Sequence, residues 1–284
     1  MAEKYFVTTA GAGMTEQLKA LWKTVFGDTD EYISLFFEKR FVPSQCVTAI
    51  SGGTVVGMLF LLPFEMVCGK ACYSGRYIYA VATHPDHRRQ GISEAMLSFA
   101  HKKAADEGAA LSALVPANAP LFEYYRKRGF ETEFYKREIT VHPDFNAESV
   151  QLDHCLLEEQ IETRRKLFSD NRMFVDWDKA ALCYQQLENE LLGGETLCFS
   201  SPKKGYALCI AGDDGVFIRE WGADALYPEL LSAIAERYQK RKITVRLAAD
   251  RSDSEAVPFA MTKWYITERK ASGVNPPFIS LVLD

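Results

Sequence analysis

Residues 77–93 constrain the fold of this chain more than any other stretch. Tyr77 to Thr83 is an apolar and aromatic run without helical spacing, which is the pattern of a buried strand. Pro85 ends that strand because it has no N–H to donate to a ladder. A helix is predicted next, with Gly108 as its stop. Its apolar face has helical spacing and comprises Ile92, Ala95, Met96, Phe99 and Ala100.

The loop between this strand and this helix carries Arg88, Arg89 and Gly91. The first amides of a helix lack internal partners, and the helix dipole favours negative charge beside them. Gly91 leaves room for a phosphate to approach the backbone, and planar guanidinium groups suit phosphate oxygens. By composition alone, the loop fits an anion site and a solvated turn with two surface arginines equally well.

Residues 88–93 read Arg-Arg-Gln-Gly-Ile-Ser and follow His84-Pro85. This stretch resembles motif A of the GCN5-related N-acetyltransferase (GNAT) superfamily, whose loop holds the pyrophosphate of acetyl-CoA. The family pattern ends in glycine or alanine, whereas this chain has Ser93 there. Because serine is small, we expect reduced clearance and not loss of the site.

Residues 118–130 resemble motif B of the same family. The positions that match its pattern are Asn118, Tyr125, Lys127, Gly129 and Phe130, and Leu121 replaces the family's small residue. Pro120 suits a first helical turn and Gly129 a C-cap, so a helix of about eight residues is predicted here. Two matched motifs at the family's separation are more specific than either alone.

The order of elements around these motifs is also similar to the GNAT order. We predict a strand at 4–9, a helix near 18–25, a second helix capped by Asp28 and Asp30, a hairpin over 45–62 and a turn at 69–75. The aromatic pair Phe36-Phe37 on the second helix favours core packing over substrate lining. The predicted fold class is α/β (α+β), with a mixed central sheet flanked by helices.

From about residue 155 the pattern of elements starts again. Helices are predicted at 157–169, 177–191 and 226–238, and strands at 196–200, 206–211, 215–221 and 242–248. We therefore predict a catalytic GNAT domain at 1–145, a linker within 144–153, and a degenerate GNAT-like domain without a cofactor motif at 146–284.

The second half lacks the residues of both motifs. Only residues 221–224 join its strand to its helix, without arginines, and Asp224 would repel phosphate. Residues 258–264 fall in the motif B place, with Lys263 about where Tyr125 stands. Tandem GNAT chains of this kind include the enhanced-intracellular-survival enzymes, which are similar in motif A but longer, with a third domain.

The resemblance assigns roles to particular residues. It gives the Val81 amide the task of polarising the thioester carbonyl, and it makes Tyr125 the donor of a proton to the departing thiolate. Packing onto the sheet is the alternative role for Tyr125, and Tyr124 is the alternative donor. The implied acetyl-CoA-binding set is Val81, Ala82, Thr83, Arg88, Arg89, Gln90, Gly91, Ile92, Ser93 and Asn118. The general base stays open among Glu65, Glu38, His84 and a water chain.

Composition narrows the choice of function. A net charge of −5 argues against nucleic acid as a partner. No apolar run has the length of a membrane span and no signal pattern opens the chain, so a cytoplasmic protein is expected. The 7 cysteines form no disulfide framework. Cys68 and Cys72 would supply half of a zinc site, but no second pair follows at ligand spacing, so no metal site is predicted.

The sequence therefore predicts an acetyl-CoA-dependent N-acetyltransferase that acts on a primary amine of a small molecule or peptide by direct attack. An acyl-CoA sensor that has kept the cleft but lost turnover is the alternative. An aminoacyl transfer enzyme using tRNA is a third reading, and the acidic balance argues against it.

Overall fold

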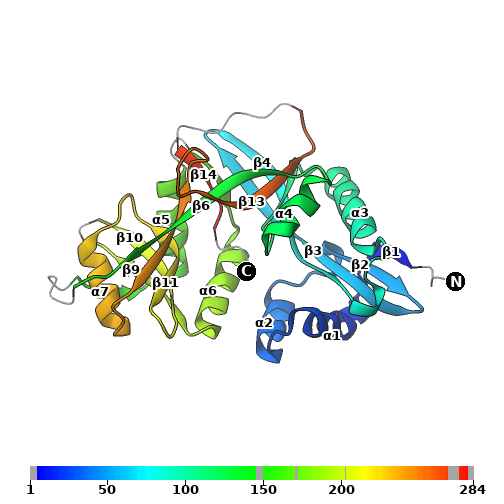
Figure 1. Cartoon of the computed structure of the whole chain (residues 1–284), viewed down its shortest axis with the longest axis horizontal. Helices are drawn as coiled ribbons and strands as arrows, with labels where there is room; N and C mark the ends of the chain where they lie inside the picture. Colours follow the sequence, from blue (N-terminus) through cyan, green and yellow to red (C-terminus); the bar gives the residue numbers. More distant parts are fainter. Residues whose placement is uncertain (1–4, 145–149, 170–171, 202, 268–274, 281–284) are drawn as a thin grey trace. The chain divides into compact units, whose positions relative to one another are not determined.

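The computed structural model describes residues 5–144, 150–169, 172–201, 203–267 and 275–280 (Figure 1). The described residues fall into two compact units. Unit 1 draws on Met1–Glu65, Tyr73–Glu131 and Met261–Arg269, and unit 2 on Met66–Cys72, Thr132–Ala260 and Lys270–Asp284. Part of the predicted linker, residues 145–149, lies outside the described residues.

Unit 1 is a mixed sheet with helices against it. Its helices are α1 (Thr15–Phe26), α2 (Asp30–Lys39), α3 (Ile92–Asp106) and α4 (Ala119–Arg126). Its strands lie in the spatial order β1 (Phe6–Thr9), β2 (Cys46–Ser51), β3 (Thr54–Cys68), β4 (Ala71–Thr83), β5 (Leu111–Leu114) and β13 (Val257–Trp264). β5 runs parallel to β4 and antiparallel to β13. β2 runs antiparallel to both of its neighbours, β1 and β3. The mixed sheet and its helices confirm the predicted fold class.

Two predictions about local structure in the first half of the chain are wrong. The cap of α2 is Thr29, whose side chain accepts from the Tyr32 amide at 3.2 Å. Asp28 instead accepts from Trp22 Nε1 at 2.6 Å. The turn between β3 and β4 is only residues 69–70, because β4 already begins at Ala71.

Alternation along β3 separates two apolar layers in unit 1. Leu59 and Leu61 face α3, where Gly57 lets Ile92 and Met96 approach the strand so closely that an added Cβ would lie 2.9 Å from each. Phe60 faces the opposite way and packs on Trp22 and Phe36 of α1 and α2. Phe36 and Phe37 are 0% and 8% exposed. Their predicted core role is therefore confirmed.

Unit 2 repeats this plan. Its helices are α5 (Leu157–Phe168), α6 (Lys179–Leu191) and α7 (Pro228–Tyr238). Its main strands lie in the order β7 (Asp153–His154), β9 (Gly194–Phe199), β10 (Gly205–Ala211), β11 (Val216–Gly222), β12 (Ile243–Ala249) and β6 (Glu131–Val141). Two further strands, β8 (Arg172–Asp176) and β14 (Asn275–Phe278), pair in parallel. The predicted repeat of elements is confirmed, with every predicted bound of these helices and strands within two residues of the observed one.

Each unit completes its sheet with a strand from the other half of the sequence. In unit 1, Met261–Trp264 of β13 pairs antiparallel with β5, from Met261 opposite Leu114 to Trp264 opposite Leu111. In unit 2, β6 pairs antiparallel with β12, from Val141 opposite Ile243 to Tyr135 opposite Ala249. The sequence placed a motif B counterpart at 258–264, and this was wrong because that segment is a strand. Lys263 donates to the Arg128 carbonyl at 2.8 Å.

The returning C-terminal segment is held in unit 1 by a polar chain. The Tyr265 hydroxyl lies 2.6 Å from Ser112 Oγ on β5 and 3.0 Å from His101 Nδ1 on α3. Burial, with a smaller contribution from Lys263, lowers the pKa of His101 to about 4. The imidazole is therefore neutral in the folded protein at neutral pH.

His101 is expected to make the protein less stable in weak acid. The unfolded imidazole protonates near pH 6.5 and the folded one near pH 4, so stability is complete above the first value and is lost as pH falls between them. The free energy of unfolding should fall by about 1 kcal/mol per pH unit in that window. Urea denaturation of the full chain and of His101→Asn at pH 7.5 and 5 measures this difference. His142→Asn, at an exposed position, is the control and should keep the parent's dependence.

Unit 2 contains a buried cation, Arg164, which is 0% exposed. Its Nη2 donates to the Val175 carbonyl at 2.8 Å, and its Nε lies 3.3 Å from Glu220 Oε1. Tyr206 and Ser280 also donate to the Glu220 carboxylate. Burial raises the pKa of Glu220, and Arg164 opposes that rise. This network depends on Arg164 because it supplies the charge opposite Glu220.

Replacing Arg164 with leucine is expected to lower the free energy of unfolding by about 3–5 kcal/mol, since Glu220 would remain buried without its cation. The neighbouring Arg165→Leu is a matched control. Arg165 pairs with Asp176 at 2.9 Å but its side chain is 56% exposed, and such pairs contribute about 0–1 kcal/mol. Equal losses in the two variants, measured by urea denaturation, would contradict this account of the buried network.

No helix in the described ranges combines the length and the apolar character needed to cross a membrane.

Candidate functional site

The candidate site begins where β4 leaves β5. The two strands pair in parallel only from Gly75 opposite Leu111 to Tyr77 opposite Ala113, although β4 continues to Thr83. β5 itself ends at Leu114, so the part of β4 beyond Tyr77 extends past its partner. Backbone groups of β4 in that segment are not used in the ladder with β5.

Ala80 forms a bulge in the part of β4 that extends beyond its pairing with β5. It has φ +48°, a left-handed value that is rare for a residue with a side chain. Tyr77 and Tyr79 stack on one face of the sheet, and Tyr79 reaches Trp22 of α1. Strict alternation would put Val81 on that face too, yet Val81 packs against the cluster under α3. The bulge thus turns the strand just before the Val81 amide.

The loop after β4 carries cations that are free of carboxylate partners. Arg88 and Arg89 are exposed, and among the described residues neither forms an ion pair. Arg88 Nε donates to the Thr83 carbonyl at 3.4 Å, which anchors the loop to the end of β4. Arg89 and Gly91 have φ +62° and +78°. For Arg89 this conformation is strained, and such strain is often found at ligand sites.

The loop places Arg88 and Arg89 just before the N-terminus of α3, a helix of 15 residues. Gly91 is its N-cap, and no side chain accepts from the first amides. Those amides and the helix dipole are therefore available to an anion. An added Cβ on Gly91 would meet only the Tyr5 hydroxyl, at 3.5 Å, so the approach to the backbone is open. Ile92 is 2% exposed and belongs to the core, so only its backbone is available.

Ser93, the departure from motif A, is bound by the motif B helix. Its Oγ lies 2.7 Å from the Tyr124 hydroxyl. The Arg128 guanidinium lies over the Tyr124 ring at 3.6 Å from the centroid and donates to the Tyr124 carbonyl at 2.8 Å. Arg128 also pairs with Glu94 at 3.4 Å. These contacts fix α4 to the start of α3, and they occupy the Tyr124 hydroxyl.

Tyr125 points into the core between α4 and the sheet. It is 7% exposed, and its ring packs edge-on against Phe130 at 5.7 Å. Burial and then Tyr124 raise the pKa of its phenol, with Arg128 opposing them. Within the described ranges its hydroxyl has no hydrogen-bond partner, in contrast to Tyr124. The phenol is thus protonated and has a proton to donate.

Asn118 is the N-cap of α4, and its Oδ1 accepts from the Leu121 amide at 3.3 Å. α4 spans the eight predicted residues. Gln90 Nε2 donates back to the Asp86 carbonyl at 3.4 Å. Ala82 is 1% exposed. The motif A loop, the end of β4 and the start of α4 all belong to unit 1.

The candidate bases are in different surroundings. Glu65 lies inside β3 and is exposed. Glu38 is exposed on α2. His84 Nδ1 accepts from the Asp86 amide at 3.4 Å, and His84 is the N-cap of the short 3-10 turn η3 (Pro85–His87).

In unit 2 the corresponding region is filled by the protein itself. β11 pairs with β12 over Val216–Ile218 and then continues, as β4 does. The next side chains, Arg219 and Glu220, are 7% and 1% exposed and engage Glu188 and Arg164 in ion pairs. In the segment before α7, Asp224 pairs with Lys203 at 2.5 Å. The arginine loop has no equivalent there.

Sequence reasoning missed three features that shape this region. The bulge at Ala80 has no residue signature, because alanine does not favour positive φ. The Tyr124–Ser93 contact joins two motifs that were considered separately. The strand Met261–Trp264 closes the sheet beside β5 from the far end of the sequence.

Comparison with known proteins agrees with this geometry. Residues 7–132 match the family model described as an acetyltransferase (GNAT) domain. No curated protein matches the chain.

Solved structures share the fold over nearly the full chain. A GCN5-related N-acetyltransferase from Kribbella flavida has a TM-score of 0.70 at 14% identity, over 92% of this chain and 71% of that one. A conserved Enterococcus faecalis protein described as a probable N-acyltransferase has 0.73 at 18%, over 92% and 72%. Eis1 from Mycobacterium abscessus has 0.65 at 11%, over 92% and 73%. At these identities the likeness establishes the fold, which is that of GNAT proteins. The segment 7–132, which the GNAT acetyltransferase domain model matches, lies within this fold.

Proposed function

We propose that this protein is an acetyl-CoA-dependent N-acetyltransferase that acetylates a primary amine of a small molecule or peptide. The observation that carries the proposal is the loop with two unpaired arginines at the N-terminus of α3, directly after the bulged end of β4 that extends beyond β5. Pyrophosphate is an anion that suits those arginines and amides, and backbone groups of β4 outside the ladder with β5 suit an extended pantetheine arm.

Binding divides among three groups of residues. The side chains of Arg88 and Arg89 and the amides of residues 90–93 would hold the pyrophosphate. Main-chain groups of residues 81–83 would hold the pantetheine arm. Asn118, besides capping α4, would approach the same arm.

Chemistry needs a polarised carbonyl and a protonated leaving group. We assign the first role to the Val81 amide, because the bulge at Ala80 fixes its direction before charge develops on the thioester oxygen. We assign the second role to Tyr125, whose raised pKa keeps the phenol protonated. Tyr124 is unsuited to it because its hydroxyl is engaged by Ser93. The attacking amine must arrive neutral and lose its proton to solvent or to a nearby base.

The second domain is proposed to be GNAT-like and without a cofactor site. The buried Glu220, paired with Arg164, follows the paired part of β11, where β4 of unit 1 has its unpaired end, and one carboxylate, Asp224, stands before α7 in place of the arginines.

A free-thiol assay tests the proposed activity. The full chain is incubated with acetyl-CoA and a panel of primary amines that includes polyamines, aminoglycosides and peptides with free amino termini. The expected result is thiol release that depends on one class of amine. Tight binding of acetyl-CoA without acceptor-dependent release from a broad panel would instead mark a sensor.

A further inference from the structure

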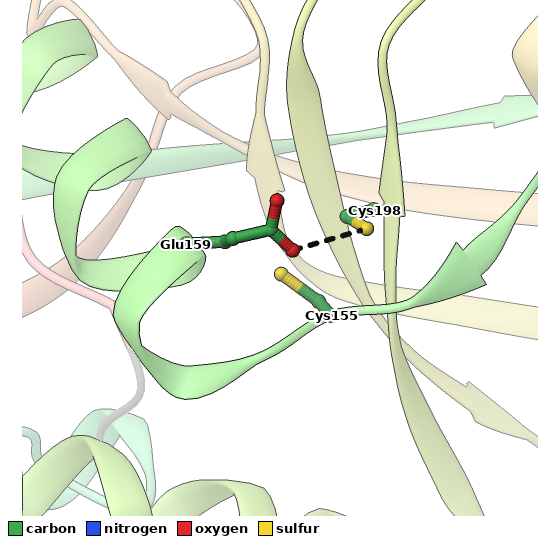
Figure 2. Close-up of side chains that lie close together, drawn as sticks. All are labelled: Cys155, Glu159 and Cys198. Atoms are coloured by element: carbon green, nitrogen blue, oxygen red, sulfur yellow. Dashed lines mark hydrogen bonds between the residues drawn. The ribbon is translucent and has the colours of Figure 1, made fainter.

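Three side chains of unit 2 with groups that can bind a metal converge on one point. They are Cys155, Glu159 and Cys198 (Figure 2). Their sulfur and carboxylate oxygen atoms all lie within 4.8 Å of one another. Cys155 directly follows β7, Glu159 is in the first turn of α5, and Cys198 is on β9. Three separate elements thus bring these groups together.

The register of the sheet explains why the two thiols meet. Asp153 is opposite Cys198 and His154 is opposite Leu197 in the antiparallel pair of β7 and β9. The Cys155 amide extends that ladder by donating to the Thr196 carbonyl at 2.8 Å. Residues two apart share a face, so Cys155 and Cys198 are diagonal neighbours on one face of the sheet. α5 starts at Leu157 and carries the Glu159 carboxylate onto that face.

The spacing is close to that of a zinc site. Zinc binds thiolate sulfur at about 2.3 Å and carboxylate oxygen at about 2.0–2.2 Å. Ligands on one tetrahedral ion are then about 3.5–3.8 Å apart. Cys198 Sγ already lies 3.7 Å from Glu159 Oε2. Since no separation in the cluster exceeds 4.8 Å, each lies at most about 1 Å above the required value, and a small side-chain rotation supplies that difference.

Charge and accessibility also fit a bound cation. Cys155 is 1% exposed, whereas Glu159 and Cys198 are partly exposed, so the cluster has one side open for entry. In the ranges that the structure describes, no lysine or arginine pairs with Glu159. Lys204 lowers the pKa of Cys155 by its charge, but it pairs with another carboxylate: its Nζ lies 3.8 Å from Glu162 Oε2. The three groups would repel one another when ionised, and a divalent cation would remove that repulsion.

We propose that Cys155, Glu159 and Cys198 bind one Zn²⁺, with water or Asp153 in the fourth position. Two thiolates and one carboxylate favour zinc over magnesium or calcium, which prefer oxygen alone. Binding releases the two thiol protons to solvent and forms two Zn–S bonds and one Zn–O bond. Asp153 is the protein candidate for the fourth ligand because it is opposite Cys198 and on the face of Cys155. The ion would join β7, α5 and β9, so its role is to stabilise unit 2.

Cobalt is the probe for this site, because Co²⁺ bound by thiolates gives a charge-transfer band in the near ultraviolet and visible bands typical of tetrahedral geometry. The reduced full chain is titrated with Co²⁺ and then with Zn²⁺. The expected result is a saturable band that Zn²⁺ abolishes, together with a higher Tm in Zn²⁺. Cys198→Ser should remove the band. Glu159→Gln keeps both thiols but removes the charged ligand. It should weaken metal binding by more than about 10-fold, because the loss of a partner that only supports a ligand already costs about that much.

Cys183→Ser is the matched control, since Cys183 is an exposed cysteine on α6 outside the cluster. It should leave the cobalt band unchanged. Zn²⁺ should also slow alkylation of Cys198 while leaving Cys183 reactive. Absence of the band in reduced protein would overturn the proposal, as would a band that survives Cys198→Ser. So would a Cys155–Cys198 disulfide in unreduced protein combined with no metal binding after reduction.

Discussion

Replacing Tyr125 with phenylalanine is expected to lower kcat for acetyl transfer by about 100-fold or more, the range of a lost general acid. The ring remains, so its packing against Phe130 is kept and acetyl-CoA binding should change little. Steady-state kinetics with saturating acetyl-CoA and the best amine measures the effect. A fall in kcat with an unchanged KM for acetyl-CoA is the signature of a group that acts on the leaving thiolate.

The pH dependence of kcat gives a second test of the role of Tyr125. The phenol must be protonated to act, so activity would be lost only as pH rises through its pKa. Burial raises that pKa above the usual value of about 10. The kcat of the parent protein should therefore show no loss from this group up to about pH 10.

Tyr124→Phe is the matched control on the adjacent position. It removes the hydroxyl that contacts Ser93, worth about 0.5–1.5 kcal/mol of stability, without removing the proposed acid. Its kcat should remain within about threefold of the parent, as expected when no general acid is lost. A large loss in Tyr124→Phe and a small one in Tyr125→Phe would show that the roles of the two tyrosines are reversed.

The double variant Arg88→Gln with Arg89→Gln is expected to raise the Kd for acetyl-CoA by about 100-fold. Each charge-assisted hydrogen bond contributes about 1.5–3 kcal/mol, and partial compensation by the α3 amides limits the total. kcat at saturating acetyl-CoA should stay close to that of the parent, because the arginines contact the pyrophosphate and not the thioester. The Kd of the parent should also rise with salt, and that of the variant much less.

Arg251→Gln is the control for this variant, since Arg251 is an exposed arginine of unit 2 outside the loop. It should bind acetyl-CoA like the parent. If the double variant also binds like the parent, the loop is a solvated turn and not a phosphate site.

Much of the fold could be predicted because local patterns determine it. The short helix α4 has Pro120 in its first turn and Asn118 as its cap, both of which are visible in the sequence. The meander of β9, β10 and β11 follows from apolar runs separated by turn residues. These elements needed no long-range contact to be recognised.

The remaining features depend on contacts between distant segments. β13 pairs with β5 although the two strands lie in opposite halves of the sequence. The apolar run of β13 at 258–264 has no residue pattern that distinguishes a strand exchanged between halves from a helix. The bulge at Ala80 is imposed by the sheet on a residue that does not favour it. Cys155, Glu159 and Cys198 come together only through the register of β7 and β9, so their spacing along the chain matches no metal motif.

We propose that the chain holds one acetyl-CoA site, built on the Arg88–Arg89 loop and on the end of β4 that extends beyond β5 in unit 1. The decisive experiment is calorimetric titration of the full chain with acetyl-CoA, repeated with the double arginine variant. The expected result is saturable binding of one acetyl-CoA per chain and a loss of about 100-fold in affinity in the variant. Absence of binding at millimolar acetyl-CoA, two equivalent sites, or undiminished affinity in the variant would contradict it.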